Sequence, residues 1–369
     1  MGRIQKILHK LDDFQFSWRA RTCAKREIKN PKRQQILNKY ILSEEQKRKI
    51  DEFFVTNYGK KIPYEYHRYY SSYMNSFDEK YIPEFIFISE IEAKLNSRDY
   101  SRVLSDKNLL PLLVGESASC RCAKIFISCT DGVLKNDRFE LVDIVKAKEI
   151  LKDAGLVFFK PSVDSSSGRD CCVYDFHNGI DSISQKHLDE ILHDCPENFN
   201  FQEVVRNCDS VKRLHPESLN TFRIVTYILN GAVYHFPVIM RIGRGKANVD
   251  NAHQGGIFIG VEDNGFLKEC GFTEFQERFF EHPDSKIRFD GYCVPEVKQC
   301  ILAAHEMQAK LSQTRMMSFD FVADESGMPI LIEINLQYQT IWMSQMAHGK
   351  GAFGENTAEI LNFIRGNFK

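Results

Sequence analysis

The segment from Ser318 to Asn335, SFDFVADESGMPILIEIN, is the feature that most constrains the fold of this chain. In each half, side chains of different character alternate as in a β-strand, and the Asp-Glu-Ser-Gly stretch between the halves is typical of a turn. The segment therefore predicts a β-hairpin. Glu333 and Asn335 are two residues apart and therefore share one face of the second strand. The hairpin would place Asp320, on the first strand, opposite that face.

These three side chains offer hard oxygen ligands, which suit Mg²⁺ better than zinc. The alternative is the polar outer face of an ordinary surface hairpin. Asp320 and Glu333 are, however, embedded among Phe, Val, Ile and Leu residues, where an unpaired charge is costly. We therefore predict a magnesium site formed by Asp320, Glu333 and Asn335.

A second feature lies upstream, where the apolar stretch Leu156–Lys160 (LVFFK) predicts a strand that ends in a lysine and stops at Pro161. The residues that follow are small: Ser165, Ser166, Ser167 and Gly168. A small-residue loop after a strand can wrap phosphates with its backbone N–H groups, and Lys160 would add a positive charge. Serine-glycine loops more often simply turn, and neither a Walker A motif nor a Rossmann glycine motif is present.

The third feature is Phe201–Val205 (FQEVV), which predicts a short strand carrying Gln202 and Glu203. In a nucleotide pocket, such a strand would offer backbone groups to adenine and a carboxylate to its amine or to the ribose. Alone, the segment would be read as an ordinary sheet strand.

The order of these features along the chain resembles the ATP-grasp superfamily, and most closely its sugar-transfer-associated family of polysaccharide biosynthesis. The resemblance runs from about Leu104 to the C-terminus and implies an α+β fold in which two α+β subdomains clasp ATP. The matching pieces are Ser105-Asp106-Lys107, Phe159-Lys160-Pro161, Asn220-Thr221-Phe222-Arg223, Arg241-Ile242-Gly243, Val249-Asp250-Asn251, Gly255-Gly256 and Glu333-Ile334-Asn335.

The resemblance implies roles in nucleotide binding for residues of these pieces. Lys107 and Lys160 would reach the phosphates of ATP. The stretch from Ser165 to Gly168 would form a flexible loop that covers the phosphates. Glu203 and Val205 would flank adenine.

It also implies the residues of the reacting centre. Asp320, Glu333 and Asn335 would hold two magnesium ions, with Glu333 able to bridge them. Arg223 and Arg241 would face the transferred phosphoryl group or an acyl phosphate.

The activity that the resemblance implies is an ATP- and Mg²⁺-dependent ligase that forms an amide from a carboxylate and an amine through an acyl phosphate. The family suggests an amino acid or other carboxylate joined to a sugar or glycan precursor. One alternative is a small-molecule kinase of the same fold, and another is a non-catalytic nucleotide-binding protein. The run Leu336-Gln337-Tyr338-Gln339 departs from the small residue and Pro-Gly that often follow the metal-binding strand, which leaves the acceptor side open.

Composition fits one such module with an additional segment. The chain has 369 residues, and no run is long enough and apolar enough to span a membrane. No signal peptide is evident. The eleven cysteines are odd in number and match no zinc pattern, which favours reduced thiols and a cytoplasmic location.

Charge is unevenly distributed, with a net charge of +9 in residues 1–49 and of −10 in the remainder. Ile4, Ile7, Leu8, Leu11 and Phe14 recur at helical spacing. This basic helix has three interpretations: docking on its own catalytic part, contact with an anionic membrane surface or with glycan-assembly enzymes, and, least favoured because no recognition motif accompanies it, nucleic-acid binding.

We predict three parts: a basic, mainly helical accessory region (1–103), an N-terminal ATP-grasp part with the phosphate-covering lid (104–205), and a C-terminal catalytic part with the metal site (206–369). The first would shape the acceptor site or recruit the glycan and would not be needed to bind nucleotide. The oligomeric state is left open.

Local patterns predict further elements of the fold. Ser43 begins a helix as a capping box would. A tyrosine-rich stretch, Tyr58–Tyr73, would line a substrate surface or, more commonly, pack at a domain seam. His253 would be a base or, more often, a structural residue. The other predicted elements are a strand at Ala123–Cys129, a hairpin of Asn220–Leu229 with Ala232–Ile242, and helices at Leu141–Ala154, Pro295–Leu311 and Asn356–Ile364.

Overall fold

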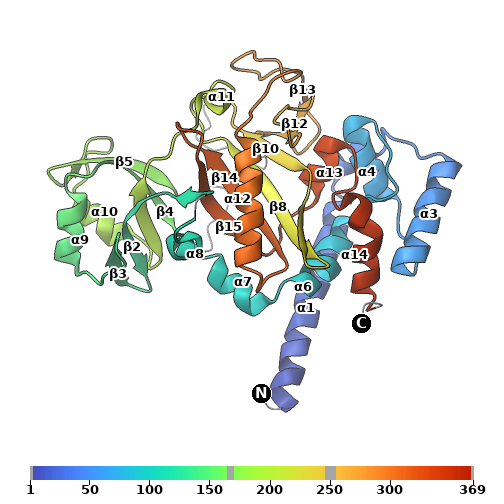
Figure 1. Cartoon of the computed structure of the whole chain (residues 1–369), viewed down its shortest axis with the longest axis horizontal. Coiled ribbons are helices and arrows are strands. Elements are labelled where there is room, and N and C mark those ends of the chain that lie inside the picture. Colours follow the sequence, from blue (N-terminus) through green and yellow to red (C-terminus); the bar gives the residue numbers. More distant parts are fainter. Residues whose placement is uncertain (1–2, 118, 164–169, 246–254, 367–369) are drawn as a thin grey trace.

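The computed structural model describes residues 3–117, 119–163, 170–245 and 255–366. Two β-sheets and a group of helices follow one another along the longest axis of the molecule (Figure 1). The six-stranded sheet lies at one end, the nine-stranded sheet lies in the middle, and helices from both ends of the chain lie at the other end. The sequence prediction of an α+β fold with an N-terminal helical region is confirmed.

The six-stranded sheet is antiparallel, with the order β3-β2-β7-β4-β5-β6. Phe159, Phe176 and Phe201 fill its core together with Ala147 and Leu151. The elements of this part are β2 (Ile125–Thr130), β3 (Val133–Asn136), α9 (Ile144–Leu151), β4 (Gly155–Pro161), β5 (Cys172–His177), β6 (Ile180–Asp181), α10 (Leu188–Asp194) and β7 (Phe199–Glu203).

The nine-stranded sheet has the order β1-β15-β14-β8-β10-β11-β12-β13, and β9 pairs with β8 beside this path. Its pairs are antiparallel except that of β1 with β15. Its strands are β1 (Arg121–Cys122), β8 (Thr221–Leu229), β9 (Ala232–His235), β10 (Val238–Ile242), β11 (Ile257–Val261), β12 (Gly271–Phe272), β13 (Arg278–Phe279), β14 (Met316–Ala323) and β15 (Pro329–Asn335).

Both faces of this sheet are buried. Phe222 and Ile224 of β8 belong to the core formed with α12 (Val297–Lys310), whereas Val225 and Tyr227 belong to the core formed with the N-terminal helices. A strand that buries both faces needs apolar residues at successive positions, as β8 has. α12 therefore covers one face, and helices from both chain ends cover the other.

The helical region is continuous with the core of the nine-stranded sheet. It comprises α1 (Arg3–Glu27), α2 (Pro31–Leu37), α3 (Glu44–Tyr58), α4 (Glu65–Met74), α5 (Glu84–Ile86), the π-helix η1 (Phe87–Ile91), α6 (Glu92–Leu95) and α7 (Arg98–Leu104). Its apolar side chains form one cluster with those of the sheet and of α13 (Trp342–His348) and α14 (Thr357–Ile364). The predicted capping box at Ser43 is present.

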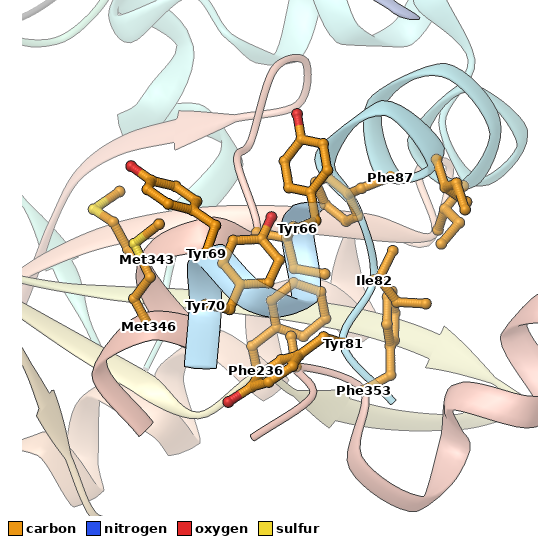
Figure 2. Close-up of a cluster of buried hydrophobic side chains, with 14 of the residues drawn as sticks. Tyr66, Tyr69, Tyr70, Tyr81, Ile82, Phe87, Phe236, Met343, Met346 and Phe353 are labelled. Carbon is orange, nitrogen blue, oxygen red and sulfur yellow. The ribbon is translucent and has the colours of Figure 1, made fainter. Parts of the chain in front are cut away.

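The tyrosine-rich stretch packs at this seam. Tyr66, Tyr69 and Tyr70 of α4 are buried, and they belong to one apolar cluster with Phe236, between β9 and β10, and Met346 of α13 (Figure 2). Of the two interpretations, packing at a domain seam is therefore the one that the structure supports. Removing the helical region would expose this apolar surface.

The predicted hairpin at Asn230-Gly231 forms, and both residues have positive φ, of 50° and 76°. The second strand was predicted as one element from Ala232 to Ile242, and this is wrong. It is divided into β9 and β10, with Pro237 between them. Proline lacks the N–H that a continuous ladder requires.

The other predicted elements form within a few residues of their expected bounds, and short elements complete the chain. Gly155, which follows the predicted helix Leu141–Ala154 and would be expected to cap its C-terminus, instead begins β4 with a φ of 65°. The remaining short elements are η2 (Lys107–Leu109), α8 (Leu110–Val114), α11 (Asp209–Lys212) and η4 (Gly354–Asn356). Among the described residues, no helix is both long and apolar enough to cross a membrane. All eleven cysteines are free.

Candidate nucleotide and metal site

The predicted carboxylates meet on the β14–β15 hairpin. Asp320 pairs directly with Glu333 in the register of the two strands, and Asn335 lies two residues further along β15, opposite Ser318. The sequence prediction that Asp320 lies opposite Glu333 is confirmed. The bulge that follows Asp320 shifts the register only beyond this pair.

Two lysines from other elements converge on the same strand. The ammonium Nζ of Lys107 lies 3.1 Å from Oε1 of Glu333. Nζ of Lys160 donates a hydrogen bond of 3.5 Å to the carbonyl of Ile332, the residue before Glu333. Both lysines are buried, although they are 53 residues apart in the chain. The structure therefore brings together the two lysines predicted to reach the phosphates and one predicted metal ligand.

A network of buried amides positions Lys107. The backbone N–H of Lys107 donates to the carbonyl of Ser162 (3.0 Å). Nδ2 of Asn108 donates to the carbonyl of Cys129 (2.9 Å), and Oδ1 of Asn108 accepts from Nδ2 of Asn200 (2.9 Å). These bonds attach η2 to the six-stranded sheet, while the Lys107 side chain reaches the nine-stranded sheet. The sequence analysis did not identify Asn108 or Asn200, since a single asparagine carries no local signal of such a contact.

The electrostatics of Lys160 favour an anionic ligand. Burial and, to a smaller extent, the neighbouring charge of Lys107 lower the pKa of Lys160 to about 8, even though Glu333 partly offsets both effects. Two neighbouring ammonium groups repel each other when water is excluded. A polyphosphate placed between them would remove this repulsion and stabilise the charged form of Lys160.

Asp320 is held in a different way. Arg223 forms a bidentate pair with it, from Nε to Oδ1 (2.9 Å) and from Nη2 to Oδ2 (2.8 Å). Nη2 of Arg241 lies 3.0 Å from Oδ2, and the Arg241 guanidinium also donates to the hydroxyl of Thr221. Burial would raise the pKa of Asp320, but the two guanidinium groups outweigh it and hold the pKa at about 2. The carboxylate is therefore ionised and fixed in orientation.

This arrangement changes the expectation for the two arginines. The sequence analysis placed Arg223 and Arg241 at the transferred phosphoryl group, and in the structure both contact Asp320. Their contact with a phosphoryl group stays a prediction.

The donor set fits a magnesium ion. Glu333 and Asn335 offer oxygen ligands on one face of β15, with Asp320 across from them. Nδ2 of Asn335 and Oγ of Ser318 are buried without a hydrogen-bond partner, so the protein leaves polar capacity unused at this end of the hairpin. In the described part of the chain, no group of three or more His, Cys, Asp and Glu side chains could hold a metal, so the asparagine would be needed. Whether two ions bind stays a prediction.

The predicted adenine-binding segment connects the two sheets. Gln202 is buried on β7 between β2 and β4, and Val205 lies in the strand-free link that follows. Oε1 of Glu203 accepts from the backbone N–H of Lys124 (2.9 Å) and from the guanidinium of Arg121. The Glu203 carboxylate thus already has a cationic partner, which the sequence did not suggest. Contacts of these three residues with adenine stay a prediction.

Several predicted residues lie outside the described part of the chain. They are the phosphate-covering loop residues Ser165, Ser166, Ser167 and Gly168, the piece Val249-Asp250-Asn251, and His253.

A pocket of about 470 Å³ lies next to the metal-binding strand. Its walls are α1, the segment 92–101 of α6 and α7, and the residues Leu336 and Gln337 that follow Asn335 directly. Consecutive Cα atoms are ~3.8 Å apart, so this wall begins within one residue of the proposed ligand set. Sequence reasoning missed this pocket because its walls come from segments more than 200 residues apart.

The segment 336–340, whose first two residues line this pocket, is strained and held by one carboxylate. Tyr338 and Thr340 have φ angles of 54° and 51°, which are unfavourable for residues with a side chain and especially for a β-branched one. The two oxygens of Glu92 accept the backbone N–H groups of Tyr338 (2.8 Å) and Gln339 (3.0 Å). Burial raises the pKa of Glu92 to about 7, although these two hydrogen bonds lower it. Strain of this kind is concentrated at functional sites.

The family model described as sugar-transfer associated ATP-grasp matches residues 87–360. No curated protein matches the chain.

Among solved structures, the VanG D-Ala:D-Ser ligase from Enterococcus faecalis is 13% identical, with a TM-score of 0.41, over 75% of this chain and 62% of that one. The D-alanine–D-alanine ligase from Bacillus anthracis is 11% identical, with a TM-score of 0.37, over 75% and 68%. The L-amino acid ligase from Bacillus licheniformis is 11% identical, with a TM-score of 0.37, over 70% of this chain and 46% of that one, so this chain spans about half the length of that protein. With the family model matching most of its length, this chain belongs to the sugar-transfer associated ATP-grasp family.

Proposed function

We propose that this protein is an ATP- and Mg²⁺-dependent ligase that joins a carboxylate to an amine. The observation that carries the proposal is the convergence of Lys107 and Lys160, from separate elements, on the strand that bears Glu333. Two buried ammonium groups beside a carboxylate and an asparagine suit a polyphosphate with its magnesium ion. The family and the fold support the same class of reaction.

The residues supply most of what such a reaction requires. Lys107 and Lys160 would neutralise and orient the phosphates, and Glu333 and Asn335 would hold the magnesium ion, which supplies further positive charge at the transferred phosphoryl group. Arg223 and Arg241 fix Asp320 at the edge of this centre. Positive groups that are already in place lower the cost of the charge that develops in the transition state.

The reaction itself balances in two steps. An oxygen of the substrate carboxylate attacks the γ-phosphorus of ATP, and the bond to ADP breaks, which gives an acyl phosphate. The amine then attacks the acyl carbon, phosphate leaves, and the amine loses a proton. Exclusion of water from the closed site would protect the acyl phosphate from hydrolysis.

The pocket beside Leu336 and Gln337 is our candidate for the acceptor. It has the size of a small-molecule site, and it offers the polar side chains of Ser17, Ser97 and Ser101 beside the aromatic ring of Phe16. Hydroxyl groups and an aromatic surface suit a polyhydroxylated ligand. We propose that a sugar or glycan precursor that carries the amine or the acid binds here.

The test is an ADP-release screen with panels of acids and amines, followed by mass spectrometry of the products. Added hydroxylamine should trap the acyl phosphate as a hydroxamate. A hydroxamate that appears only with an acid, ATP and Mg²⁺ supports the ligase, whereas a phosphorylated alcohol without hydroxamate would show a kinase.

A matched pair of variants controls the screen. Lys160→Met removes a buried ammonium group of the site, and Lys146→Met removes an exposed one on α9, which pairs with Glu149. We expect the first to weaken ATP binding about tenfold or more, because a charge-assisted contact with phosphate is lost, and the second to leave it unchanged. Equal ATP affinity in both variants would remove the assignment of the phosphate site.

A further inference from the structure

One side of α1 carries a stripe of large apolar side chains that are exposed in the part of the protein that the structure describes. Leu11, Phe14 and Trp18 are spaced at i, i+3 and i+7, so they lie on one side of the helix. Their exposed fractions are 58%, 70% and 58%. Single exposed hydrophobic residues are ordinary on protein surfaces, but three large ones aligned on a helix indicate an interaction surface.

The opposite side of α1 is attached to the protein, which fixes the direction in which this stripe points. Ala20 and Ala24 are buried in the core of the helical region, and the carbonyl of Ala24 accepts a hydrogen bond from the hydroxyl of Tyr66 (2.9 Å). Further along the helix, Asp12 pairs with Arg98 at 2.6 Å. Rotating α1 to bury the stripe would break these contacts. We therefore do not expect the stripe to pack against the rest of the same chain.

Figure 1 shows that α1 projects from the body of the molecule, with the N-terminal end at the tip. In the sequence, the apolar spacing of the stripe continues towards that tip at Ile7 and Ile4, with Lys6 and Lys10 between and after them. The projecting part of the helix therefore combines apolar and basic residues.

Charge identifies the partner. The first 49 residues carry a net charge of +9, and Arg19, Lys25 and Arg26 are exposed along α1. The acidic residues of the exposed half, Asp12 and Asp13, both lie near Arg98. A second copy of this chain would bring like charges together, which disfavours self-association through α1. An anionic surface with an apolar interior satisfies both the charge and the stripe.

We propose that α1 docks this protein on the surface of an anionic lipid bilayer, with Leu11, Phe14 and Trp18 inserted among the lipids and the basic residues at the headgroups. Residues of α1, with Phe14 of the stripe among them, form one wall of the pocket beside Leu336. Docking would therefore bring that pocket close to substrates held at a membrane. This last consequence rests on the proposed function, whereas membrane docking itself does not.

The experiment uses the full chain and the fluorescence of Trp18. The protein has two tryptophans, and Trp342→Phe leaves Trp18 as the single reporter. With vesicles of phosphatidylcholine and phosphatidylglycerol, we expect a blue shift of Trp18 emission and sedimentation of the protein with the vesicles. Added salt should weaken both, because the attraction is partly electrostatic.

Variants in the Trp342→Phe background test the stripe. Leu11→Ser should weaken partitioning onto the anionic vesicles about tenfold, since it removes a large apolar side chain from the lipid contact, and Leu11 does not line the pocket beside Leu336. Leu141→Ser, at another highly exposed apolar residue (73% exposed), should leave it unchanged. Circular dichroism and ATP binding confirm that both variants are folded.

Three results would overturn the proposal. One is an unchanged emission spectrum and a protein that stays in solution with anionic vesicles. Another is equal partitioning onto vesicles of phosphatidylcholine alone. The third is a lipid-free oligomer that Leu11→Ser dissociates, since the stripe would then be a contact between copies of the chain. None of these results bears on ligase activity, so failure here and failure of the proposed function can be told apart.

Discussion

Asp320 and Glu333 face each other across β14 and β15, yet the protein surrounds them with different partners. Asp320 is buried, and two guanidinium groups hold it. Glu333 is half-buried, with the lysine ammonium of Lys107 beside it. Two carboxylates a few ångströms apart can thus serve different purposes.

The chemistry of the groups that contact Asp320 and Glu333 indicates which role each carboxylate has. A bidentate guanidinium pair is rigid and directional, whereas an ammonium group on a flexible stem can move to a new anion. Glu333 is therefore the carboxylate that can exchange a lysine contact for a metal ion when nucleotide binds. The charge of Asp320, in contrast, already balances Arg223 and Arg241 in the protein without nucleotide. Four substitutions test this comparison.

The largest effect is expected for Asp320→Asn, which leaves Arg223 and Arg241 without the carboxylate that both contact. Breaking a buried pair by removing one partner costs about 3–5 kcal/mol, so we expect the free energy of unfolding in denaturant to fall by that order. Glu45→Gln, whose partner Arg48 is exposed, is the control and should leave stability unchanged. A stable Asp320→Asn variant that has merely lost activity would show that Asp320 serves the ligand alone.

Glu333→Gln should give the opposite result, with loss of activity and an unchanged fold. Replacing the carboxylate removes a metal-binding charge from a half-buried position, and we expect ADP release to fall about a hundredfold or more. The melting temperature without ligand should change little. Glu190→Gln, at an exposed residue of α10, controls for the loss of one charge. Full activity of Glu333→Gln would refute the metal assignment.

A third carboxylate, that of Glu84, differs from Asp320 in the direction of its pKa shift. Glu84 is half-buried, and its Oε2 accepts a long hydrogen bond of 3.4 Å from the N–H of Ile341. Burial raises the pKa of Glu84 from 4.5 to about 8. The folded protein therefore binds more protons than the unfolded chain between these values, so this residue makes stability fall as the pH rises from about 4.5 to about 8. For Asp320, whose pKa is depressed, the contribution is lost as the pH falls below 3.8 towards about 2.

Glu84→Gln should remove the fall in stability that Glu84 causes as the pH rises from about 4.5 to about 8. One titrating group can contribute at most about 1.4 kcal/mol per pH unit to the slope of stability. We expect the variant to gain stability at the alkaline end and to match the parent at the acidic end, as measured by denaturant unfolding across the pH range. Parallel curves for the two proteins would mean that Glu84 does not titrate in this window.

The comparison also shows which parts of the site can be predicted from sequence. The two-residue period of a strand and a recognisable turn were sufficient to place Asp320 opposite Glu333. The contact of Arg223 with Asp320 depends instead on β8 pairing with β14, which joins residues 97 positions apart. Strand order across such a separation is set by the packing of the whole sheet and not by any local pattern.

The helical region is another instance of the same limit. Its helices and its capping box follow from local spacing and composition. That Tyr73 packs against Phe258 of β11 and Phe272 of β12, and that the region forms a wall of the pocket, cannot be predicted from spacing. The family match confirmed the fold class, whereas the boundaries at residues 103 and 205 stay a prediction.

The smallest effect is expected for Glu203→Gln. Its pair with Arg121 is partly exposed, and such pairs contribute about 0–1 kcal/mol, so stability should hardly change. If Glu203 also contacts adenine or ribose, as the resemblance implies, ATP should bind about fivefold more weakly, which corresponds to the loss of one hydrogen bond. Inorganic triphosphate lacks both base and sugar, and its affinity should stay the same. Equal losses for ATP and triphosphate would show that the substitution disturbs the phosphate site through the sheet, and no loss for either would assign Glu203 to the contact between β7 and Arg121 alone.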